Sequence, residues 1–157
     1  MTYPPQRIVC LTEETVETLY LLGQEDRIVG VTGYAVRPNR VRQEKPRVGA
    51  FTSADVPKIR DLSPDLVLTF SDLQADIAAE LIKGGIAVHA FNQRDLAGIL
   101  DMIRTIGALT DCTDQASGLV LDLERKLSCV RNTARASRPR VYRSEEHTSE
   151  LQSLTNL

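Results

Sequence analysis

Residues 56–70, which read VPKIRDLSPDLVLTF, decide the fold class of this 157-residue chain. Pro57 suits the first turn of a short helix over 56–62, because the helix needs no amide hydrogen at that position. The SPD sequence at 63–65 predicts a turn. The apolar run Leu66–Phe70 is short and partly β-branched, which indicates a buried strand. A helix that leads directly into a buried strand is typical of α/β proteins.

The same alternation of strands and helices extends in both directions from this stretch. Parallel strands need crossover connections, which are right-handed and usually helical, so the pattern predicts an α/β fold with a doubly wound parallel sheet. After residue 110 the pattern predicts a long helix instead of another strand. The predicted strands are 8–12, 27–33, 47–51, 66–70 and 86–91, with one more beginning at 140–142, and the predicted helices are 13–22, 56–62, 72–83, 95–109 and 114–136.

The composition limits the classes of function. Hydrophobic residues make up 42% of the chain, charged residues make up 25%, and the formal net charge is −2, as in an ordinary globular protein. Because the chain has no overall basic field, we expect no nucleic-acid partner. No run approaches the roughly 18 apolar residues of a membrane helix, so we expect no membrane span. The three cysteines form no CxxC pair, which argues against a disulfide framework and against a metal site.

The first residues, MTYPPQR, carry neither a basic segment nor an apolar segment before the first predicted strand. We therefore expect no signal peptide, and the chain as written is expected to be cytoplasmic. A misplaced start codon would instead allow a periplasmic or cell-surface protein.

Aromatic residues are scarce, and most of them fall at the ends of predicted strands. Phe51, Phe70 and Phe91 are the last residues of three strands, and Tyr34 follows a fourth. Ligands of doubly wound sheets bind beyond the carboxyl ends of the strands, where such side chains would form the wall of a pocket. Aromatic walls suit a large flat or apolar ligand. The alternative is that the rings only pack against the rim of the sheet.

A basic loop follows the second predicted strand. Most such runs are solvated surface. The alternative is an anion contact through Arg37, because the loop leaves the carboxyl end of a strand beside Tyr34. The basic residues of the loop are Arg37, Arg40, Arg42, Lys45 and Arg47.

Residues with catalytic potential are few and isolated. His89 lies within an apolar strand, where a buried histidine with satisfied hydrogen bonds is a better interpretation than a base. Cys10 lies in the first strand and is expected to be a small core residue. Gly30 and Gly33 do not form the glycine pattern of a dinucleotide site. The chain is therefore not expected to be an enzyme, although an α/β enzyme with its catalytic residues in a missing half is an alternative.

Residues 143–157 break every pattern described above, since they are polar and unpatterned and begin just as a strand starts. The stretch RSEEHTSELQS at 143–153 resembles the translation of a sequencing-library adapter. We therefore expect residues 143–157 to be an artefactual tail and the natural part to be an N-terminal fragment. His147 lies in this tail and is not a candidate ligand or catalyst.

Four stretches together match a family pattern, and the most specific of them is the last. They are RIVCLTEETVETLYLLG at 7–23, DRIVGVTGY at 26–34, PRVG at 46–49 and VPKIRDLSPDLV at 56–67. They resemble the class III substrate-binding proteins of ABC importers, the vitamin B12 and iron-siderophore type. The resemblance implies an N-terminal lobe of the periplasmic-binding-protein type over 7–110 and a helix over 114–138 that joins it to a second, missing lobe. The ligand would lie between the two lobes.

The resemblance also implies a ligand and its contacts. Tyr34, Phe51 and Phe70 match aromatic positions that contact the corrin ring in cobalamin binders, and Arg37 is expected to reach polar groups of the ligand. The expected function is reversible capture of a large corrinoid, above all cobalamin, as a cargo and not as a catalytic cofactor. Binding of a ferric siderophore or haem by the same fold is the alternative. The predicted ligand-binding residues are Tyr34, Phe51, Phe70, Thr12, Glu13, Phe91, Asn92 and Arg37.

One departure from the family pattern concerns the membrane partner. Members that deliver their ligand to an ABC permease present a glutamate at the start of the short helix, where this chain has Pro57. The nearest acidic residue is Asp55. We therefore expect either uptake through an ABC permease, with Asp55 in the docking role, or a carrier that handles the corrinoid inside the cell.

Overall fold

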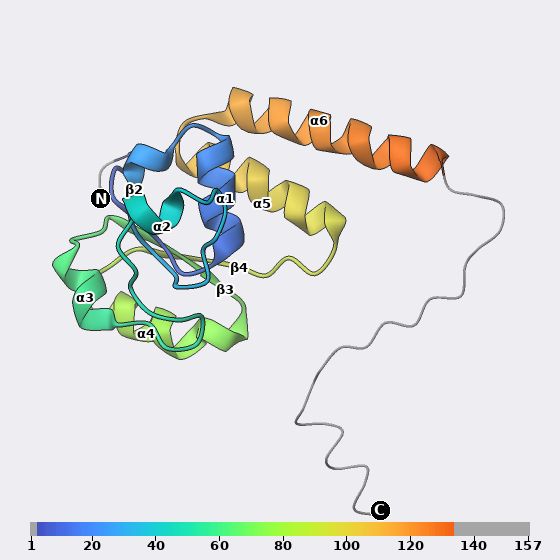
Figure 1. Ribbon diagram of the computed structural model, residues 1–157. Coiled ribbons are helices and arrows are strands. Elements are labelled where there is room, and N and C mark those ends of the chain that lie inside the picture. Colours follow the sequence, from blue (N-terminus) through green and yellow to red (C-terminus); the bar gives the residue numbers. More distant parts are fainter. Residues whose placement is uncertain (1–2, 134–157) are drawn as a thin grey trace, which may run out of the picture. The chain divides into compact units, whose positions relative to one another are not determined.

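The computed structural model describes residues 3–133 of the chain (Figure 1). The strand predicted at 140–142 and the tail expected at 143–157 lie outside these residues, so both stay predictions. The chain divides into two units after Lys126, and the fold described below is that of the first unit.

The centre of the first unit is a sheet of four parallel strands in the order β2-β1-β3-β4. The direction in which the strands are added changes between β1 and β3, which are the two central strands. This is the doubly wound α/β sheet that the sequence predicts, with its switch point between β1 and β3. The strands are β1 (Ile8–Cys10), β2 (Ile28–Val31), β3 (Leu66–Phe70) and β4 (Val88–Phe91).

Helices cover both faces of the sheet (Figure 1). One face is covered by α1 (Glu13–Leu21), α5 (Leu96–Leu109) and the first part of α6 (Thr113–Asn132), and the other by α3 (Val56–Asp61) and α4 (Ala75–Lys83). All five lie where the sequence predicts helices. Three shorter elements are η1 (Glu25–Arg27), α2 (Val41–Glu44) and η2 (Asp72–Gln74). The sequence pattern does not predict α2, which lies in the basic loop, and η2 replaces the first turn of the helix predicted from residue 72.

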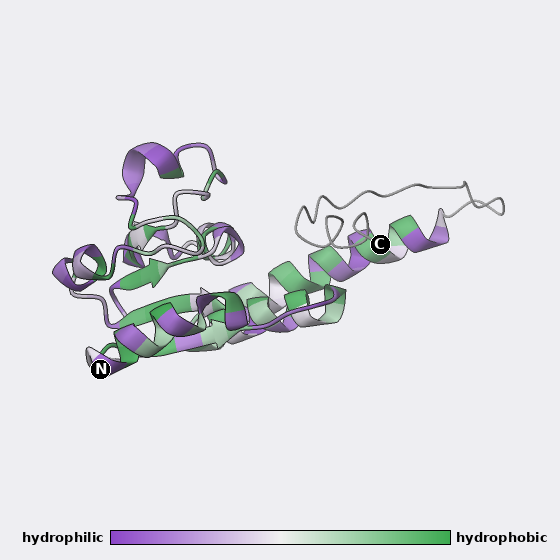
Figure 2. Cartoon of the chain, turned by 90° about the horizontal axis from the view of Figure 1, so that it is seen from below, coloured by the Kyte–Doolittle hydropathy of each residue, from purple (hydrophilic) through white to green (hydrophobic). Residues whose placement is uncertain are grey.

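Two apolar clusters form the core, one on each side of the sheet. Residues of β1 and the position after it alternate between them, because successive side chains of a strand point to opposite faces. Ile8 and Cys10 pack with α1, α5 and α6, whereas Val9 and Leu11 pack with α3 and α4. Figure 2 shows the strands predominantly in green, the colour of hydrophobic residues. Burial on both faces explains why β1 and β3 are predominantly apolar runs in the sequence.

The boundaries of the helices follow from local chemistry. Asp55 and Asp95 each cap a helix, and their carboxylates accept from the N–H groups of Lys58 at 3.0 Å and Gly98 at 2.7 Å. Gly23 ends α1 with φ +68°, in the left-handed conformation that glycine adopts without strain. Among the helices of residues 3–133, none combines the length and the apolarity that crossing a bilayer requires.

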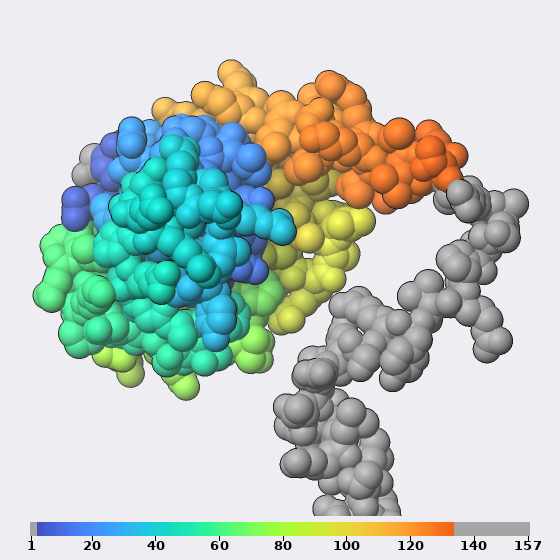
Figure 3. Space-filling model, in the orientation of Figure 1, coloured from blue at the N-terminus to red at the C-terminus, as the bar shows by residue number. Residues whose placement is uncertain are grey.

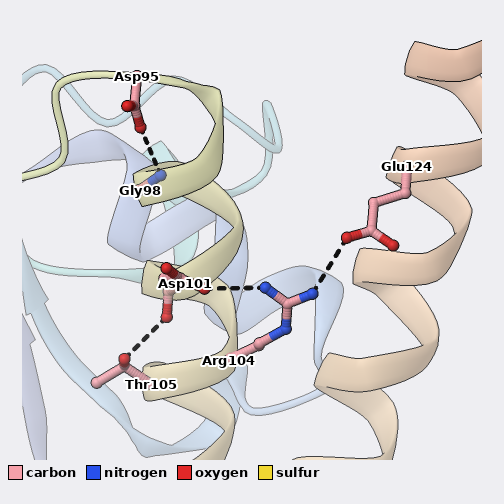
Figure 4. A network of polar contacts seen from close by, with 6 residues as sticks. All are labelled: Asp95, Gly98, Asp101, Arg104, Thr105 and Glu124. Atoms are coloured by element: carbon pink, nitrogen blue, oxygen red, sulfur yellow. Dashed lines mark hydrogen bonds and ion pairs between the residues drawn. The ribbon is translucent and has the colours of Figure 1, made fainter.

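A polar network joins α5 to α6 (Figure 4). Arg104 of α5 donates to Asp101 on the same helix at 2.9 Å and to Glu124 of α6 at 3.2 Å. Gly107 of α5 lies so close to Ala116 of α6 that any side chain at 107 would collide with it. The close approach and the Arg104–Glu124 ion pair hold the first part of α6 against α5.

The strand predicted at 47–51 is wrong as a regular strand. Arg47 forms one parallel bridge to Val31 of β2, and Gly49 forms one antiparallel bridge within the loop. Gly49 has φ +131°, a conformation that other residues rarely adopt, so the chain leaves the regular geometry of a strand at this residue. Phe51 therefore lies on a loop, which we call the 47–55 loop, and not at the last position of a strand.

Candidate ligand-binding site

A hollow of about 410 Å³ opens at the carboxyl edge of the sheet, where the sequence analysis predicts a ligand. The hollow lies between the N-terminus of α1, the segment after β2 and the 47–55 loop. In Figure 3 the chain that follows β2, coloured cyan, covers much of the face turned to the viewer. Three predicted ligand-binding residues, Glu13, Tyr34 and Phe51, share this hollow. The lining side chains are Glu13, Glu14, Thr32, Tyr34, Phe51 and Thr52.

Backbone contacts bring Tyr34 and Phe51 to the same hollow. The N–H of Gly33 donates to the carbonyl of Gly49 at 2.7 Å, which joins the segment after β2 to the 47–55 loop. A Cβ atom at Gly33 would approach that carbonyl to 3.2 Å, and one at Gly49 would lie only 2.5 Å from the carbonyl oxygen of Ser53. Glycine at both positions therefore permits the contact.

Phe51 and Phe70 form an aromatic pair beside the hollow. Their ring centroids lie 6.4 Å apart and their planes are tilted by 48°, which is a favourable arrangement for two rings. The guanidinium carbon of Arg94 lies 5.4 Å from the centroid of the Phe70 ring, and Arg94 also pairs with Asp72 at 3.6 Å. Phe70 ends β3 as predicted, so the pair combines one ring carried by a strand with one carried by a loop.

Gln74, the last residue of η2, is a site residue that the sequence analysis missed. Its side chain is buried, since the residue is only 1% exposed. Its Nε2 atom donates to the carbonyls of Phe51 at 2.7 Å and Leu11 at 3.1 Å, and its Oε1 atom accepts from the N–H of Phe70 at 2.9 Å. The sequence pattern only places Gln74 within the helix predicted over 72–83, which by itself names none of these partners.

Thr12 does not line the hollow, although the sequence analysis places it among the ligand-binding residues. Its side chain is buried, and its Oγ1 atom lies 3.1 Å from Oγ1 of Thr15 in the first turn of α1. Thr12 occupies the cap position of α1 without a side-chain capping hydrogen bond. Its side chain therefore supports the turn into α1.

Tyr34, in contrast, is 60% exposed, which leaves its ring accessible to a ligand.

Phe91 and Asn92 are separated from the larger hollow. They line a second hollow of about 270 Å³ together with His89, and the Phe91 side chain itself is buried. One contact joins this region to the larger hollow, because Nε2 of Gln93 donates to Oε1 of Glu14 at 3.2 Å. The structure therefore does not bring Phe91 and Asn92 into the same wall as Tyr34 and Phe51.

Arg37 faces a neighbouring hollow instead of the aromatic pair. Its side chain is 75% exposed and lies 4.0 Å from the carboxylate of Glu17. The neighbouring hollow has a volume of about 240 Å³ and shares Glu13 and Glu14 with the larger one. Arg37 is thus next to the predicted site, with a carboxylate as its ionic partner.

The middle of the basic loop is held against Tyr20 of α1. The guanidinium carbon of Arg40 lies 4.9 Å from the centroid of the Tyr20 ring, and Arg40 pairs with Glu25 at 3.0 Å. The hydroxyl of Tyr20 donates to Glu44 at 2.7 Å, and burial together with this carboxylate raises the pKa of Tyr20. Arg40 therefore anchors the loop, which agrees with the interpretation of the basic run as surface.

Cys10 and His89, which the sequence analysis considered for chemistry, differ in their burial. Cys10 is fully buried in β1, and burial raises the pKa of its thiol to about 12. His89 is only half-buried, whereas the sequence analysis expects a buried histidine. Its ring lies 4.4 Å from that of Phe91, and burial lowers the pKa of the imidazole. Across residues 3–133, no group of three or more His, Cys, Asp or Glu side chains is arranged to hold a metal ion.

The start of α3 carries the two residues that bear on a membrane partner. Pro57 lies in the first turn, as predicted, and the exposed Asp55 is the cap. One carboxylate oxygen of Asp55 accepts from the N–H of Lys58. Asp55 thus has a structural task in this helix, and its docking role stays a prediction.

The chain belongs to the periplasmic binding protein family, which matches it over residues 8–147. A cobalamin-binding protein of Halobacterium salinarum is 26% identical over 143 residues, which cover 88% of this chain and 39% of that protein. YvrC of Bacillus subtilis, an uncharacterized ABC transporter substrate-binding lipoprotein, is 30% identical over 135 residues, which cover 83% of this chain and 42% of YvrC. The chain spans about two fifths of the length of these curated relatives.

Solved structures share the fold. The periplasmic vitamin B12 binding protein BtuF of Vibrio cholerae has a TM-score of 0.77 at 23% identity, over 87% of this chain and 53% of that one. A periplasmic heme binding protein from Pseudomonas aeruginosa has a TM-score of 0.76 at 22% identity, over 82% and 46%. The siderophore binding protein BauB has a TM-score of 0.75 at 21% identity, over 88% and 52%. The predicted periplasmic-binding-protein-like fold is confirmed.

Family membership establishes the class of protein. The chain belongs to a family of binding proteins, and its curated relatives are described as binding proteins, not as enzymes. Family membership thus confirms the expectation, drawn from the lack of catalytic motifs, that the chain is not an enzyme.

Proposed function

We propose that this chain forms the N-terminal lobe of a protein that reversibly captures a corrinoid, with cobalamin as its cargo. The observation that carries the proposal is the hollow at the carboxyl edge of the sheet, walled by Tyr34 and by Phe51, which is paired with Phe70. Such a wall offers a large flat ligand extensive apolar contact. A second lobe, for which the greater length of the relatives leaves room, would cover the other side of the ligand.

The charges around the hollow support a corrinoid over the alternatives. The hollow and its neighbour are lined by the carboxylates of Glu13, Glu14 and Glu17 and by the guanidinium of Arg37. The propionates of haem and the anionic groups of many ferric siderophores would meet repulsion at such a surface. The amide side chains of a corrinoid can instead donate hydrogen bonds to carboxylates. The name of the cobalamin-binding relative supports the same ligand.

We further propose that an ABC permease receives the ligand. The description of YvrC as an ABC transporter substrate-binding lipoprotein supports this partner. Asp55 would take the docking role, because it is exposed at the start of α3, close to Pro57. A carrier that handles the corrinoid inside the cell is the alternative, and the compartment of the protein stays a prediction.

Isothermal titration of the full-length protein with three probes tests the proposed ligand. The probes are cyanocobalamin, haem and a ferric catecholate siderophore. We expect saturable one-to-one binding of cyanocobalamin, with the other two binding at least about tenfold more weakly. Tighter binding of haem or of the siderophore would show that this ligand, and not cobalamin, is the cargo, and the protein would still be a binding protein. Binding of none of the three would contradict the proposal.

A further inference from the structure

We propose that Gln74 is the positioning residue of the Phe51–Phe70 pair and that it acts by taking the place of a backbone hydrogen bond at the switch point of the sheet. The effect on affinity rests on the proposed function, in which the pair contacts the ligand. The positioning itself is a property of the protein without ligand.

The first observation is an interruption of the ladder between β1 and β3. The N–H of Leu11 donates to the carbonyl of Leu68 at 2.9 Å. In a regular parallel ladder the carbonyl of Leu11 would then accept from the N–H of Phe70. Instead, the Leu11 carbonyl accepts from Nε2 of Gln74, and the Phe70 N–H donates to Oε1 of Gln74. The side-chain amide of Gln74 therefore lies between the two strands where they would otherwise pair.

The second observation is that the same amide reaches the 47–55 loop. An amide nitrogen carries two hydrogens, so it can donate twice while its oxygen accepts. The second hydrogen of Gln74 is directed to the carbonyl of Phe51, at 2.7 Å, the shortest of the three contacts. Phe51 has no regular strand to hold it, so this hydrogen bond ties its backbone to the sheet.

The third observation is the turn that presents Gln74. Ser71 has φ +51°, its N–H donates to the carbonyl of Phe91 at 2.7 Å, and its Oγ atom accepts from the N–H of Leu73 at 3.3 Å. This turn ends β3 and returns the chain through η2, so that the Gln74 side chain bonds to the last residue of the same strand. Because Gln74 is buried, water does not compete for its three hydrogen bonds.

The consequence is a preorganised aromatic pair. A ring on a mobile loop loses conformational entropy when it binds a ligand, whereas a ring on a fixed loop does not. Gln74 fixes the loop before the ligand arrives, and it does so through the backbone of Phe51, without being part of the wall that the ligand meets.

Hydrogen exchange of the full-length protein without ligand tests the positioning. Gln74→Met keeps the length of the side chain and removes its donors and its acceptor. We expect exchange in the 47–55 loop to become at least about tenfold faster, while exchange in α1 changes little. Gln93→Met is the matched control, because Gln93 contacts Glu14 and not the loop. Unchanged exchange in the 47–55 loop, or equal acceleration throughout the lobe, would overturn the proposal. Gln74→Asn, which shortens the side chain by one methylene, is the second variant if Gln74→Met does not fold, and the same expectations apply to it.

A double-mutant cycle tests whether Gln74 acts on binding through Phe51. We expect Gln74→Met to weaken cyanocobalamin binding about tenfold when Phe51 is present and less than about threefold in the Phe51→Ala background. Equal losses of affinity in both backgrounds would show that Gln74→Met does not act through Phe51, and would overturn the role of Gln74 in binding. If the unmodified protein does not bind cyanocobalamin, the proposed function fails, and hydrogen exchange still decides whether Gln74 positions the loop.

Discussion

Phe51 and Phe70 have adjacent rings, yet the segments that carry them are held in different ways. Phe70 ends β3, whose backbone pairs with β1 on one side and with β4 on the other. Phe51 lies on the 47–55 loop, which has only isolated bridges and depends on the conformation of Gly49 and on the side chain of Gln74. One ring is thus carried by a strand that stays paired with β4 as far as Phe70, and the other by a loop that a few specific contacts hold.

This difference separates stability from binding. Phe70 packs against the core cluster that α1, α5 and α6 share, whereas Phe51 belongs to neither core cluster. Truncation of Phe70 should therefore lower the stability of the folded protein as well as its affinity for the ligand. Truncation of Phe51 should lower the affinity for the ligand and leave the stability nearly unchanged.

The largest expected effect is a loss of stability when Gly49, in the 47–55 loop that carries Phe51, is replaced. Gly49→Ala should lower the free energy of unfolding by about 2–4 kcal/mol, because the new Cβ atom adds backbone strain and a collision with the loop. The measurement is urea unfolding. Gly85→Ala is the control, since Gly85 also has positive φ but open space around it, and we expect a loss of about 1–2 kcal/mol there. A loss at Gly49 no larger than the loss at Gly85 would show that the loop relaxes freely.

The second prediction compares the two rings directly. Phe51→Ala should weaken cyanocobalamin binding by about 1–3 kcal/mol, the scale of a lost aromatic contact, with little change in the melting temperature. Phe70→Ala should weaken binding and also lower the melting temperature. Calorimetric titration and thermal unfolding of the full-length protein measure both quantities. Ile82→Ala is the control for an exposed apolar side chain on α4 and should change neither. Unchanged affinity in Phe51→Ala would remove Phe51 from the site.

The smallest expected effect concerns β4, which within residues 3–133 pairs with β3 alone. Burial holds the pKa of His89 below its ordinary value of 6.5, so the unfolded chain binds a proton more readily than the folded one. The free energy of unfolding should therefore fall as the pH drops through about 6.5, until His89 is protonated in both states. His89→Gln should remove this part of the pH dependence. Urea unfolding between pH 7.5 and pH 5, run on both proteins at about the same ionic strength, measures the difference. If the free energy of unfolding depends on pH equally in the unmodified protein and in His89→Gln, His89 is not the source of this pH dependence.

The regular elements and part of the site could be predicted from the sequence. The apolar runs, the caps at Asp55 and Asp95 and the glycine after α1 are local signals, and the structure has strands and helices where they indicate. The position of Phe70 at the end of β3 follows from the same signals. The strand predicted at 47–51 is wrong as a regular strand, because an apolar run looks the same whether or not a neighbouring strand continues beside it.

By itself, the sequence determined that this protein is a doubly wound α/β lobe of the periplasmic binding protein type with aromatic residues at the carboxyl edge of its sheet. The tertiary structure decided which side chains share a wall. It placed Glu13, Tyr34 and Phe51 around one hollow, buried Thr12, turned Arg37 toward Glu17 and set Phe91 and Asn92 apart. It also brought Gln74 to Leu11, 63 positions earlier in the chain. The physical reason is that burial and hydrogen bonds between distant segments depend on how strands and loops meet in space, whereas the pattern of apolar residues reports only on the neighbours along the chain.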